Sequence, residues 1–136
     1  DAAEKKTRFL SALAEKLNIT DGIKIKHCRA EQEAGANRAF YDAVTARAVA
    51  PLNTLLECAL PLLKEGGVFA AYKGANAVEE AERAENAALL TGASLKEIIF
   101  YSLENPRDRA LVVYEKTGET PARFPRKNNN PRRKPL

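Results

Sequence analysis

Residues 41–52 change from one kind of local structure to another over a short stretch. A strand-like run over residues 41–45 leads into the charged Arg47, and Pro51 then opens a run of leucines at helical spacing. A strand, a short loop and a helix make half of a βαβ unit, and open α/β sheets bind ligands at the carboxyl ends of their strands. The sequence therefore predicts an α/β fold in which Arg47 lies beside a cofactor or a substrate.

Further helices and strands alternate on both sides of this segment. We expect helices over residues 3–17, 51–63 and 77–92, and strands over residues 23–28, 41–45, 68–72, 95–103 and 110–114. Lysines along one face of residues 23–28 favour an edge strand there. Residues 30–36 indicate only a loop or one helical turn, and Asn105-Pro106-Arg107-Asp108 separates the last two strands. Alternation followed by a strand pair indicates a mostly parallel sheet with an antiparallel pair at one edge.

The positive charge is concentrated at one end of the chain. Of the 22 basic residues six lie in residues 121–136, which contain no acidic residue, so residues 1–120 keep 16 basic against 18 acidic residues. We therefore divide the chain into a folded part, residues 1–116, and a basic, proline-containing tail, residues 117–136, in which we expect no core. A basic tail indicates a polyanionic partner, nucleic acid above all, although a solubilising disordered tail is the alternative. The tail cations are Arg123, Arg126, Lys127, Arg132, Arg133 and Lys134.

Length and composition favour one domain without membrane spans or structural metal. The 136 residues are enough for a single core, no apolar run approaches membrane-spanning length, and there is a single histidine. The two cysteines, Cys28 and Cys58, form no disulfide framework and favour a reducing compartment, so we expect a cytoplasmic protein. The chain begins with Asp1 rather than Met, as though a preceding strand had been removed.

Three other positions are candidates for ligand contacts. Asp1 precedes a helix where a strand would end, so it is equally suited to bind ribose hydroxyls and to act as a helix N-cap. Arg29-Ala30-Glu31 follows the expected edge strand and could contact an adenine, but a surface turn is favoured from spacing alone. Lys73 ends a strand, where it either meets an RNA phosphate or is solvated. No Ser/His/Asp set, metal motif, P-loop or G-x-G-x-x-G is visible, so we assign neither catalytic residues nor metal ligands.

The chain resembles the C-terminal portion of the bacterial 16S rRNA (guanine-N7)-methyltransferases, also called glucose-inhibited division protein B. The resemblance spans essentially all 136 residues and is most specific in Thr45-Ala46-Arg47-Ala48-Val49-Ala50 combined with the final Lys134-Pro135-Leu136. It departs from the family in two ways: the N-terminal helices and glycine-rich loop are absent, and Asn128-Asn129-Asn130 replaces the usual Gly and Pro of the tail. Its remaining motifs are Asp1-Ala2 with Lys5, Lys6 and Phe9, Arg29-Ala30-Glu31, Lys73-Gly74-Ala75-Asn76, residues 109–113 and Phe124-Pro125-Arg126-Lys127.

The resemblance implies a class I, Rossmann-like fold with helices on both faces of the sheet, here only in part. It implies that S-adenosylmethionine is the cofactor and that a guanine N7 in the decoding-region loop of 16S rRNA is methylated. Asp1, Ala2 and Ala3 would meet the ribose side of the cofactor, Ala30 and Glu31 its adenine, and Arg47 would line the site. Lys73 and the tail cations would contact RNA in the small ribosomal subunit, and we expect a monomer.

Two other functions remain open on the residues alone. A non-catalytic RNA-binding α/β domain would use the tail while its cleft is vestigial. A fragment of a nicotinamide-dependent oxidoreductase fits less well, because the tail is basic and no proton-relay residue is present.

Overall fold

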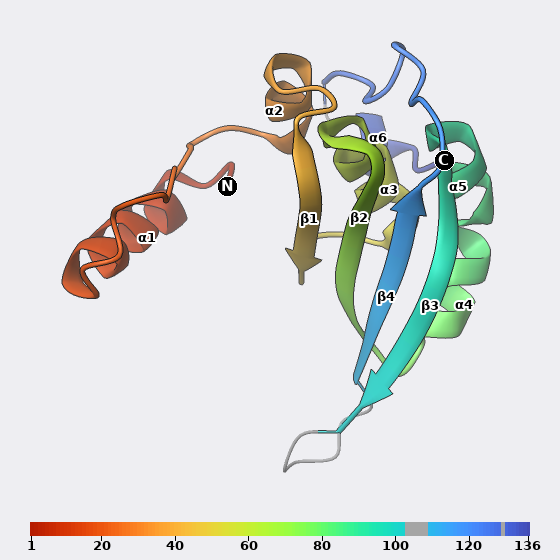
Figure 1. The fold of residues 1–136 in the computed structure, drawn as a ribbon, viewed down its shortest axis with the longest axis horizontal. Helices are drawn as coiled ribbons and strands as arrows, with labels where there is room; N and C mark the ends of the chain where they lie inside the picture. Colours follow the sequence, from red (N-terminus) through yellow and green to blue (C-terminus); the bar gives the residue numbers. More distant parts are fainter. Residues whose placement is uncertain (103–108, 129) are drawn as a thin grey trace.

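The computed structural model describes residues 1–102, 109–128 and 130–136, in which four strands form one sheet in the order β1-β2-β4-β3 (Figure 1). The connection expected over Asn105–Asp108 lies outside the described residues. The strands are β1 (Tyr41–Arg47), β2 (Leu63–Gly74), β3 (Ala93–Tyr101) and β4 (Arg109–Lys116). The helices are α1 (Glu4–Lys16), α2 (Ala30–Ala36), α3 (Leu52–Ala59), η1 (Leu60–Leu62), α4 (Ala77–Arg83), α5 (Glu85–Thr91) and α6 (Asn130–Arg133).

The sheet is mixed, and most of its pairings are antiparallel. β1 pairs with β2 in parallel, whereas β4 lies antiparallel to β2 and to β3. The strand–helix–strand unit from β1 through α3 to β2 and the antiparallel pair of β3 and β4 are therefore confirmed. The expectation of a mostly parallel sheet is wrong for this chain, because β4 inserts between β2 and β3 and accounts for two of the three pairings.

One face of the sheet carries the core. Alternate side chains of the two central strands point to this face, including Phe69 and Ala71 of β2 and Val112 and Tyr114 of β4, and all four are buried. They pack against α3, α4 and α5, whose buried residues come at helical spacing, as in Leu52, Leu55, Leu56 and Ala59 of α3. Burial of each large apolar side chain contributes about 1.5–3 kcal/mol, so this layer holds α3 firmly behind β1 and β2.

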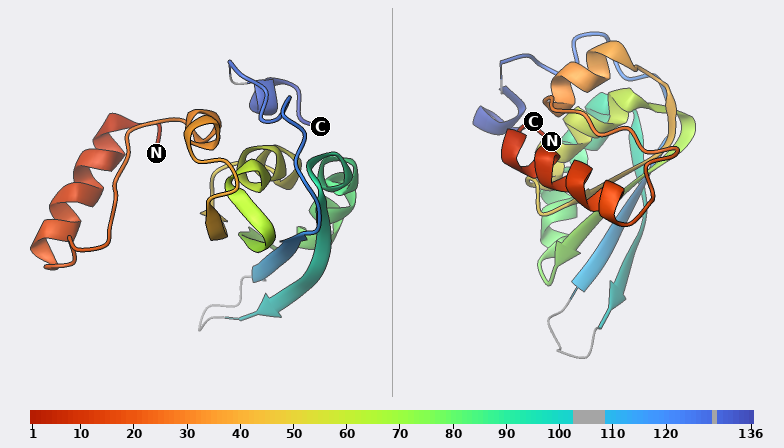
Figure 2. Two further views of the ribbon diagram at one scale, coloured as in Figure 1. Left: turned by 45° about the horizontal axis from the view of Figure 1, so that its top comes forward. Right: turned by 90° about the vertical axis from the view of Figure 1, so that its left-hand side faces the viewer.

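The other face of the sheet is not covered by helices within the described residues. Tyr72 of β2 is 44% exposed and Ile99 of β3 is 41% exposed on this face. Figure 2 shows α3, α4 and α5 on one side of the sheet, with α1 standing away from it. The expectation of helices on both faces is therefore wrong for the described chain. The leucines of α1 and its C-cap remain exposed because that helix does not reach the sheet: Leu10, Leu13 and Leu17.

The expected strand over residues 23–28 does not form. Among the described residues, this segment pairs with the first residue alone, apart from a turn in which the Ile23 amide donates to the Thr20 carbonyl: the Asp1 amine donates to the Lys26 carbonyl, and the Cys28 amide donates to the Asp1 carbonyl. A strand needs a partner along its length to satisfy its backbone groups, and one residue of pairing is too little to supply that.

The C-terminal residues fold back onto the domain. Thr120, Phe124 and Pro131 are buried, and Leu136 packs against the core cluster. The Arg38 side chain donates to the carbonyls of Thr120, Pro121 and Phe124, which holds the start of this segment beside the sheet. The expectation that no core exists beyond Lys116 is therefore wrong. No helix in the described ranges has the length and apolar character needed to cross a membrane.

Candidate functional site

Arg47 is the last residue of β1 and belongs to the uncovered face of the sheet. Val44 and Ala46 pack toward the core, so the alternation of a strand sends Thr45 and Arg47 the other way. Arg47 is exposed and lies in register with Tyr72 of the neighbouring parallel strand. Within the described part of the chain its guanidinium makes no hydrogen bond or ion pair. The sequence prediction that Arg47 stands at a carboxyl end of the sheet is confirmed.

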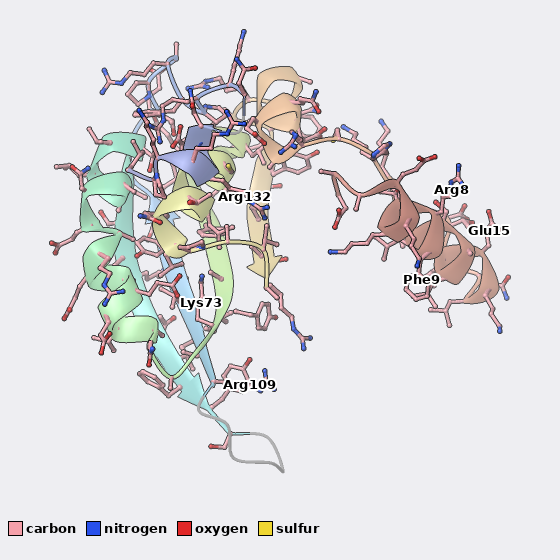
Figure 3. The ribbon with its side chains drawn as sticks, turned by 180° about the vertical axis from the view of Figure 1, so that it is seen from behind. Arg8, Phe9, Glu15, Lys73, Arg109 and Arg132 are labelled. Atoms are coloured by element: carbon pink, nitrogen blue, oxygen red, sulfur yellow. The ribbon has the colours of Figure 1, made fainter. Side chains whose placement is uncertain are left out.

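The loop after Arg47 is held by a buried cation and a carboxylate. Lys73 Nζ, on a side chain that is 11% exposed, donates to the Ala50 carbonyl at 2.8 Å and to Glu80 Oε1 at 2.7 Å. The same Glu80 oxygen accepts from the Leu52 amide at 2.9 Å and so satisfies one free N–H at the start of α3. Lys73 is the last residue but one of β2 (Figure 3). Because its ammonium group makes these contacts inside the protein, it is already occupied.

Asp1, Ala2 and Ala3 form a turn beside residues 26–28. The Asp1 carboxylate accepts a hydrogen bond from the Ala3 amide at 2.8 Å, as a residue preceding a helix commonly does. All three residues are exposed, and the His27 ring lies 3.2 Å from the Ala2 carbonyl. The two hydrogen bonds of Asp1 to Lys26 and Cys28 follow the parallel pattern, so both segments run in the same direction here.

Ala30 and Glu31 begin α2 directly after this segment. Ala30 is exposed and Glu31 is half-buried, and the Arg29 amide donates to the Gln32 side chain at the start of the helix. The structure therefore brings Ala30 and Glu31 into the same region as Asp1. It does not bring Arg47 there, because α2 lies beside the amino end of β1 and Arg47 lies at its opposite end (Figure 1).

Glu33 connects α2 to the segments on either side of it, and we did not predict this role from the sequence. Its Oε1 accepts from Lys26 Nζ at 2.6 Å, from Tyr41 Oη at 2.8 Å and from the Asn37 amide group at 2.8 Å. The Lys26 ammonium is the main reason that the pKa of the Glu33 carboxyl is lowered, with the Tyr41 hydroxyl next. Asn37 caps the same helix, but Lys26 and Tyr41 lie outside α2 on either side of it, and the pattern of the helix alone does not reveal that they meet at Glu33.

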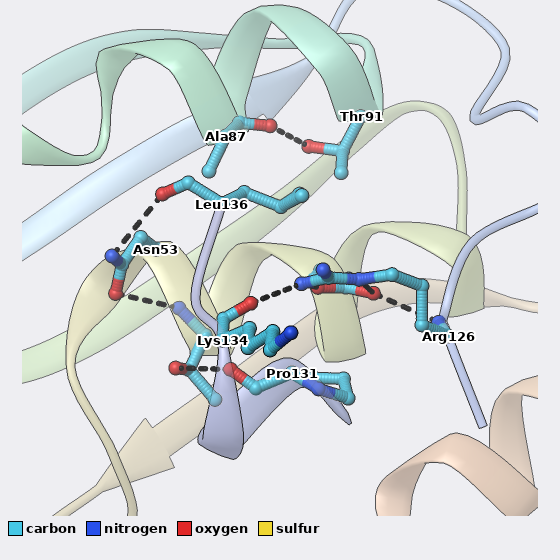
Figure 4. A network of polar contacts seen from close by, with 9 residues as sticks. Asn53, Ala87, Thr91, Arg126, Pro131, Lys134 and Leu136 are labelled. Atoms are coloured by element: carbon cyan, nitrogen blue, oxygen red, sulfur yellow. Dashed lines mark hydrogen bonds and ion pairs between the residues drawn. The ribbon is translucent and has the colours of Figure 1, made fainter. Parts of the chain in front are cut away.

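The six tail cations differ in their surroundings. Arg126 pairs with Glu57 of α3, a carboxylate that is 0% exposed, through Nη2 at 2.6 Å (Figure 4). The other five cations are exposed, and one of them, Arg132, donates to a backbone carbonyl of the loop after Arg47. No group of three or more His, Cys, Asp or Glu residues suited to a metal occurs among the described residues.

Comparisons of sequence give a consistent family. Residues 1–112 match the family described as "GidB: rRNA small subunit methyltransferase G". The chain is 42% identical over 139 aligned positions to ribosomal RNA small subunit methyltransferase G of Listeria monocytogenes serotype 4b. It is 43% identical over 138 positions to the protein of that name from Streptococcus gordonii. Both alignments cover 100% of this chain but only 58% of the relative, so the chain spans little more than half the length of these curated proteins.

Comparisons of structure give the fold. An rRNA methylase from Streptococcus thermophilus superposes with a TM-score of 0.59 at 19% identity, covering 87% of this chain and 71% of the other. A geranyl diphosphate methyltransferase in complex with SAM superposes with a TM-score of 0.63 at 10% identity, covering 85% and 66%. The described sheet and helices therefore have the α/β, Rossmann-like methyltransferase fold.

Proposed function

The chain belongs to the GidB family of small-subunit rRNA methyltransferases G, and from this premise we propose that the protein methylates N7 of a guanine in 16S rRNA. The methyl donor is S-adenosylmethionine, and the target guanine lies in the decoding-region loop. The observation that carries the proposal is the match at 42% identity across the whole chain.

The proposed reaction needs no general acid or base. Guanine N7 carries no proton and presents a lone pair, so its methylation needs no base to remove one. S-adenosylmethionine supplies a methyl group on a positively charged sulfur that is already electrophilic. The protein has to hold the nitrogen, the methyl carbon and the sulfur in line, and such positioning can lower a barrier by several kcal/mol, up to about 10. We therefore assign no catalytic acid or base.

The residues near the N-terminus have the right chemistry for the adenosine part of the cofactor. The exposed Asp1 carboxylate and the half-buried Glu31 carboxylate can accept hydrogen bonds; Asp1 pairs with Lys26 and Cys28, and Glu31 follows Cys28 at the start of α2. Ribose hydroxyls and an adenine amino group are donors that such oxygens bind. We assign Asp1, Ala2 and Ala3 to the ribose, and Ala30 and Glu31 to the adenine. Arg47, at the other end of β1, is assigned to the reacting groups.

The RNA would be held by the exposed cations of the tail. Arg123, Lys127, Arg133 and Lys134 are exposed, and such cations bind phosphates without reading sequence. Arg126 and Lys73 have carboxylate partners inside the protein, which makes them weaker candidates for phosphate contacts. In this proposal the protein acts as a monomer on the small ribosomal subunit in the cytoplasm, without a metal ion.

Transfer of a labelled methyl group tests the proposal. The protein as its gene encodes it is incubated with methyl-labelled S-adenosylmethionine and 16S rRNA from a strain that lacks the activity, and the labelled base is identified after digestion. We expect 7-methylguanine at one position in the decoding region. RNA binding without cofactor binding would favour the alternative of a non-catalytic RNA-binding domain, and label on another base or atom would contradict the proposal.

A further inference from the structure

The last residues of the chain form a strap along α3, which we define as residues 120–128 and 130–136. Its firmest contact is Arg126 with Glu57: the Arg126 amide and Nε each donate to Oε1 at 2.8 Å, and Nη2 donates to Oε2 at 2.6 Å. Three hydrogen bonds satisfy a carboxylate that would otherwise be buried and unpaired, a state that costs several kcal/mol. The strap is therefore fixed to the last turn of α3.

The strap continues from there to the first turn of α3. Thr54 Oγ1 donates to the Pro131 carbonyl at 2.9 Å, and the Asn53 side chain donates to the Leu136 carbonyl at 3.2 Å (Figure 4). Arg126 Nη2 also donates to the Lys134 carbonyl at 2.7 Å, which closes the strap upon itself. The strap thus ends beside the turn of α3 that follows the Arg47 loop.

One side chain of the strap reaches that loop directly. Arg132 Nη2 donates to the Val49 carbonyl at 2.7 Å, while Lys73 donates to the carbonyl of the next residue, Ala50. Ala48, just before them, has a φ of 54°, a left-handed conformation that costs a non-glycine residue free energy and needs support from its surroundings. Two cations from distant parts of the chain therefore hold adjacent carbonyls of the loop that begins at Arg47.

We infer that Arg132 is a positioning residue: it fixes the loop that sets the backbone of Arg47. The inference rests on the proposed function in that Arg47 contacts the reacting groups. The C-terminal strap then has a second role besides RNA affinity. Because Arg126 fixes the strap to α3, Arg132 is held where it can support the loop at the end of β1. Because Arg132 acts through the Val49 carbonyl, its removal lowers the rate of methyl transfer from the bound state.

The neighbouring Arg133 provides a matched control. Both arginines are exposed on the short helix α6, but Arg133 makes no hydrogen bond or ion pair with the described residues. Arg132→Ala and Arg133→Ala remove the same charge at adjacent positions. If each cation also touches an RNA phosphate, both variants raise KM for RNA to a similar extent. We expect only Arg132→Ala to lower kcat as well, on the order of ten-fold, since small displacements of reacting groups cost rate.

Two further measurements separate positioning from a general structural effect. Arg132→Lys keeps a donor of similar reach, so we expect it to recover part of the lost kcat. Amide hydrogen exchange at Leu52, whose N–H donates to Glu80 at the end of this loop, should be faster by roughly ten-fold in Arg132→Ala than in Arg133→Ala, with no change in the strands, because only the loop opens more often.

The outcomes are distinguishable. Equal kcat and equal loop exchange in the two alanine variants would overturn the inference, and so would loss of exchange protection throughout the domain in Arg132→Ala alone. If none of the proteins, wild type included, methylates RNA, the proposed function fails. The exchange comparison still decides in that case whether Arg132 fixes the loop.

Discussion

Arg47 is exposed, has no hydrogen bond or ion pair with the described residues, and lies at the carboxyl end of β1. A side chain without partners in the described chain contributes little to folding, so Arg47→Ala should leave thermal unfolding unchanged. If its guanidinium orients the reacting groups, kcat/KM for RNA methylation should fall about 100-fold. Arg83→Ala is the control, because Arg83 is an exposed arginine of α4 paired only with Glu79 at 3.5 Å. A large drop in the unfolding temperature of Arg47→Ala would instead make Arg47 structural.

Tyr114 is a core residue in which an apolar ring and a polar hydroxyl are buried together. It is 1% exposed, yet its hydroxyl has no hydrogen-bond partner among the described residues, and burial raises its pKa to about 12. Tyr114→Phe removes the unsatisfied group and keeps the ring, so the free energy of unfolding should stay the same or rise by up to about 1 kcal/mol. Tyr114→Leu, which loses ring contacts, should lower it by about 2–3 kcal/mol. These values can be measured by urea denaturation at pH 7.

The same hydroxyl gives a pH dependence with a definite sign. Because the folded-state pKa lies above the ordinary value of 10.0, the folded protein holds this proton more tightly than the unfolded chain does. The contribution of the Tyr114 proton to the free energy of unfolding is therefore complete below about pH 10 and is lost as the pH rises toward 12. Tyr114→Phe should lose less stability than wild type over this interval. Parallel curves for the two proteins would show that folding does not shift the pKa of this hydroxyl. A Tyr114→Phe variant weaker by more than about 1 kcal/mol at pH 7 would indicate a hydrogen-bonded hydroxyl.

At the scale of elements, the end of α5 depends on a glycine. Gly92 has a φ of 75°, and a Cβ there would lie 2.6 Å from the Gly118 carbonyl oxygen. Gly92→Ala thus adds left-handed strain to a backbone clash, and we expect the free energy of unfolding to fall by about 2 kcal/mol or more. Gly118→Ala is the control, since a Cβ at Gly118 meets nothing within 4 Å. Equal unfolding midpoints for the two variants would show that the turn between α5 and β3 yields easily.

Local patterns predicted the elements whose partners lie close in sequence. β1, α3 and β2 follow one another, and the antiparallel β3 and β4 are neighbours along the chain, so period and turn signals were enough. Residues 23–28 have an alternating pattern as well, but they lack a partner strand and stay irregular. Strand formation depends on such pairing, which a single-segment pattern does not contain.

Contacts at the site between residues far apart in the sequence could not be predicted from local patterns either. Arg47 could be placed at a strand end from its immediate neighbours, whereas Glu57 and Arg126 are 69 residues apart and Arg132 and Val49 are 83 residues apart. A tail rich in proline, asparagine and arginine looks unable to fold by its own composition. It folds because Glu57 and Arg38 on the domain supply partners that its own sequence lacks.

In the whole molecule, folding of the strap fixes where its positive charges lie on the surface. Five of its six cations are exposed and form no hydrogen bond or ion pair with a carboxylate in the described chain, among them Arg123, Lys127 and Arg133. A folded strap presents them at fixed positions on one surface, where phosphates can replace released counterions. Their charges should therefore contribute to RNA affinity, while Arg126 remains committed to Glu57.

Replacing these three residues by glutamine tests that role without deleting the strap. We expect weaker 16S rRNA binding and a slope of log affinity against log salt that is flatter by about two to three, since each lost phosphate contact removes just under one. Lys64→Gln, Arg83→Gln and Lys96→Gln form a control of equal charge change, because these cations pair with Asp42, Glu79 and Glu115. Cofactor affinity should be the same in both triple variants, as phosphate contacts position RNA and leave the adenosine site untouched. Equal salt slopes for the two variants would place the RNA on another face of the protein.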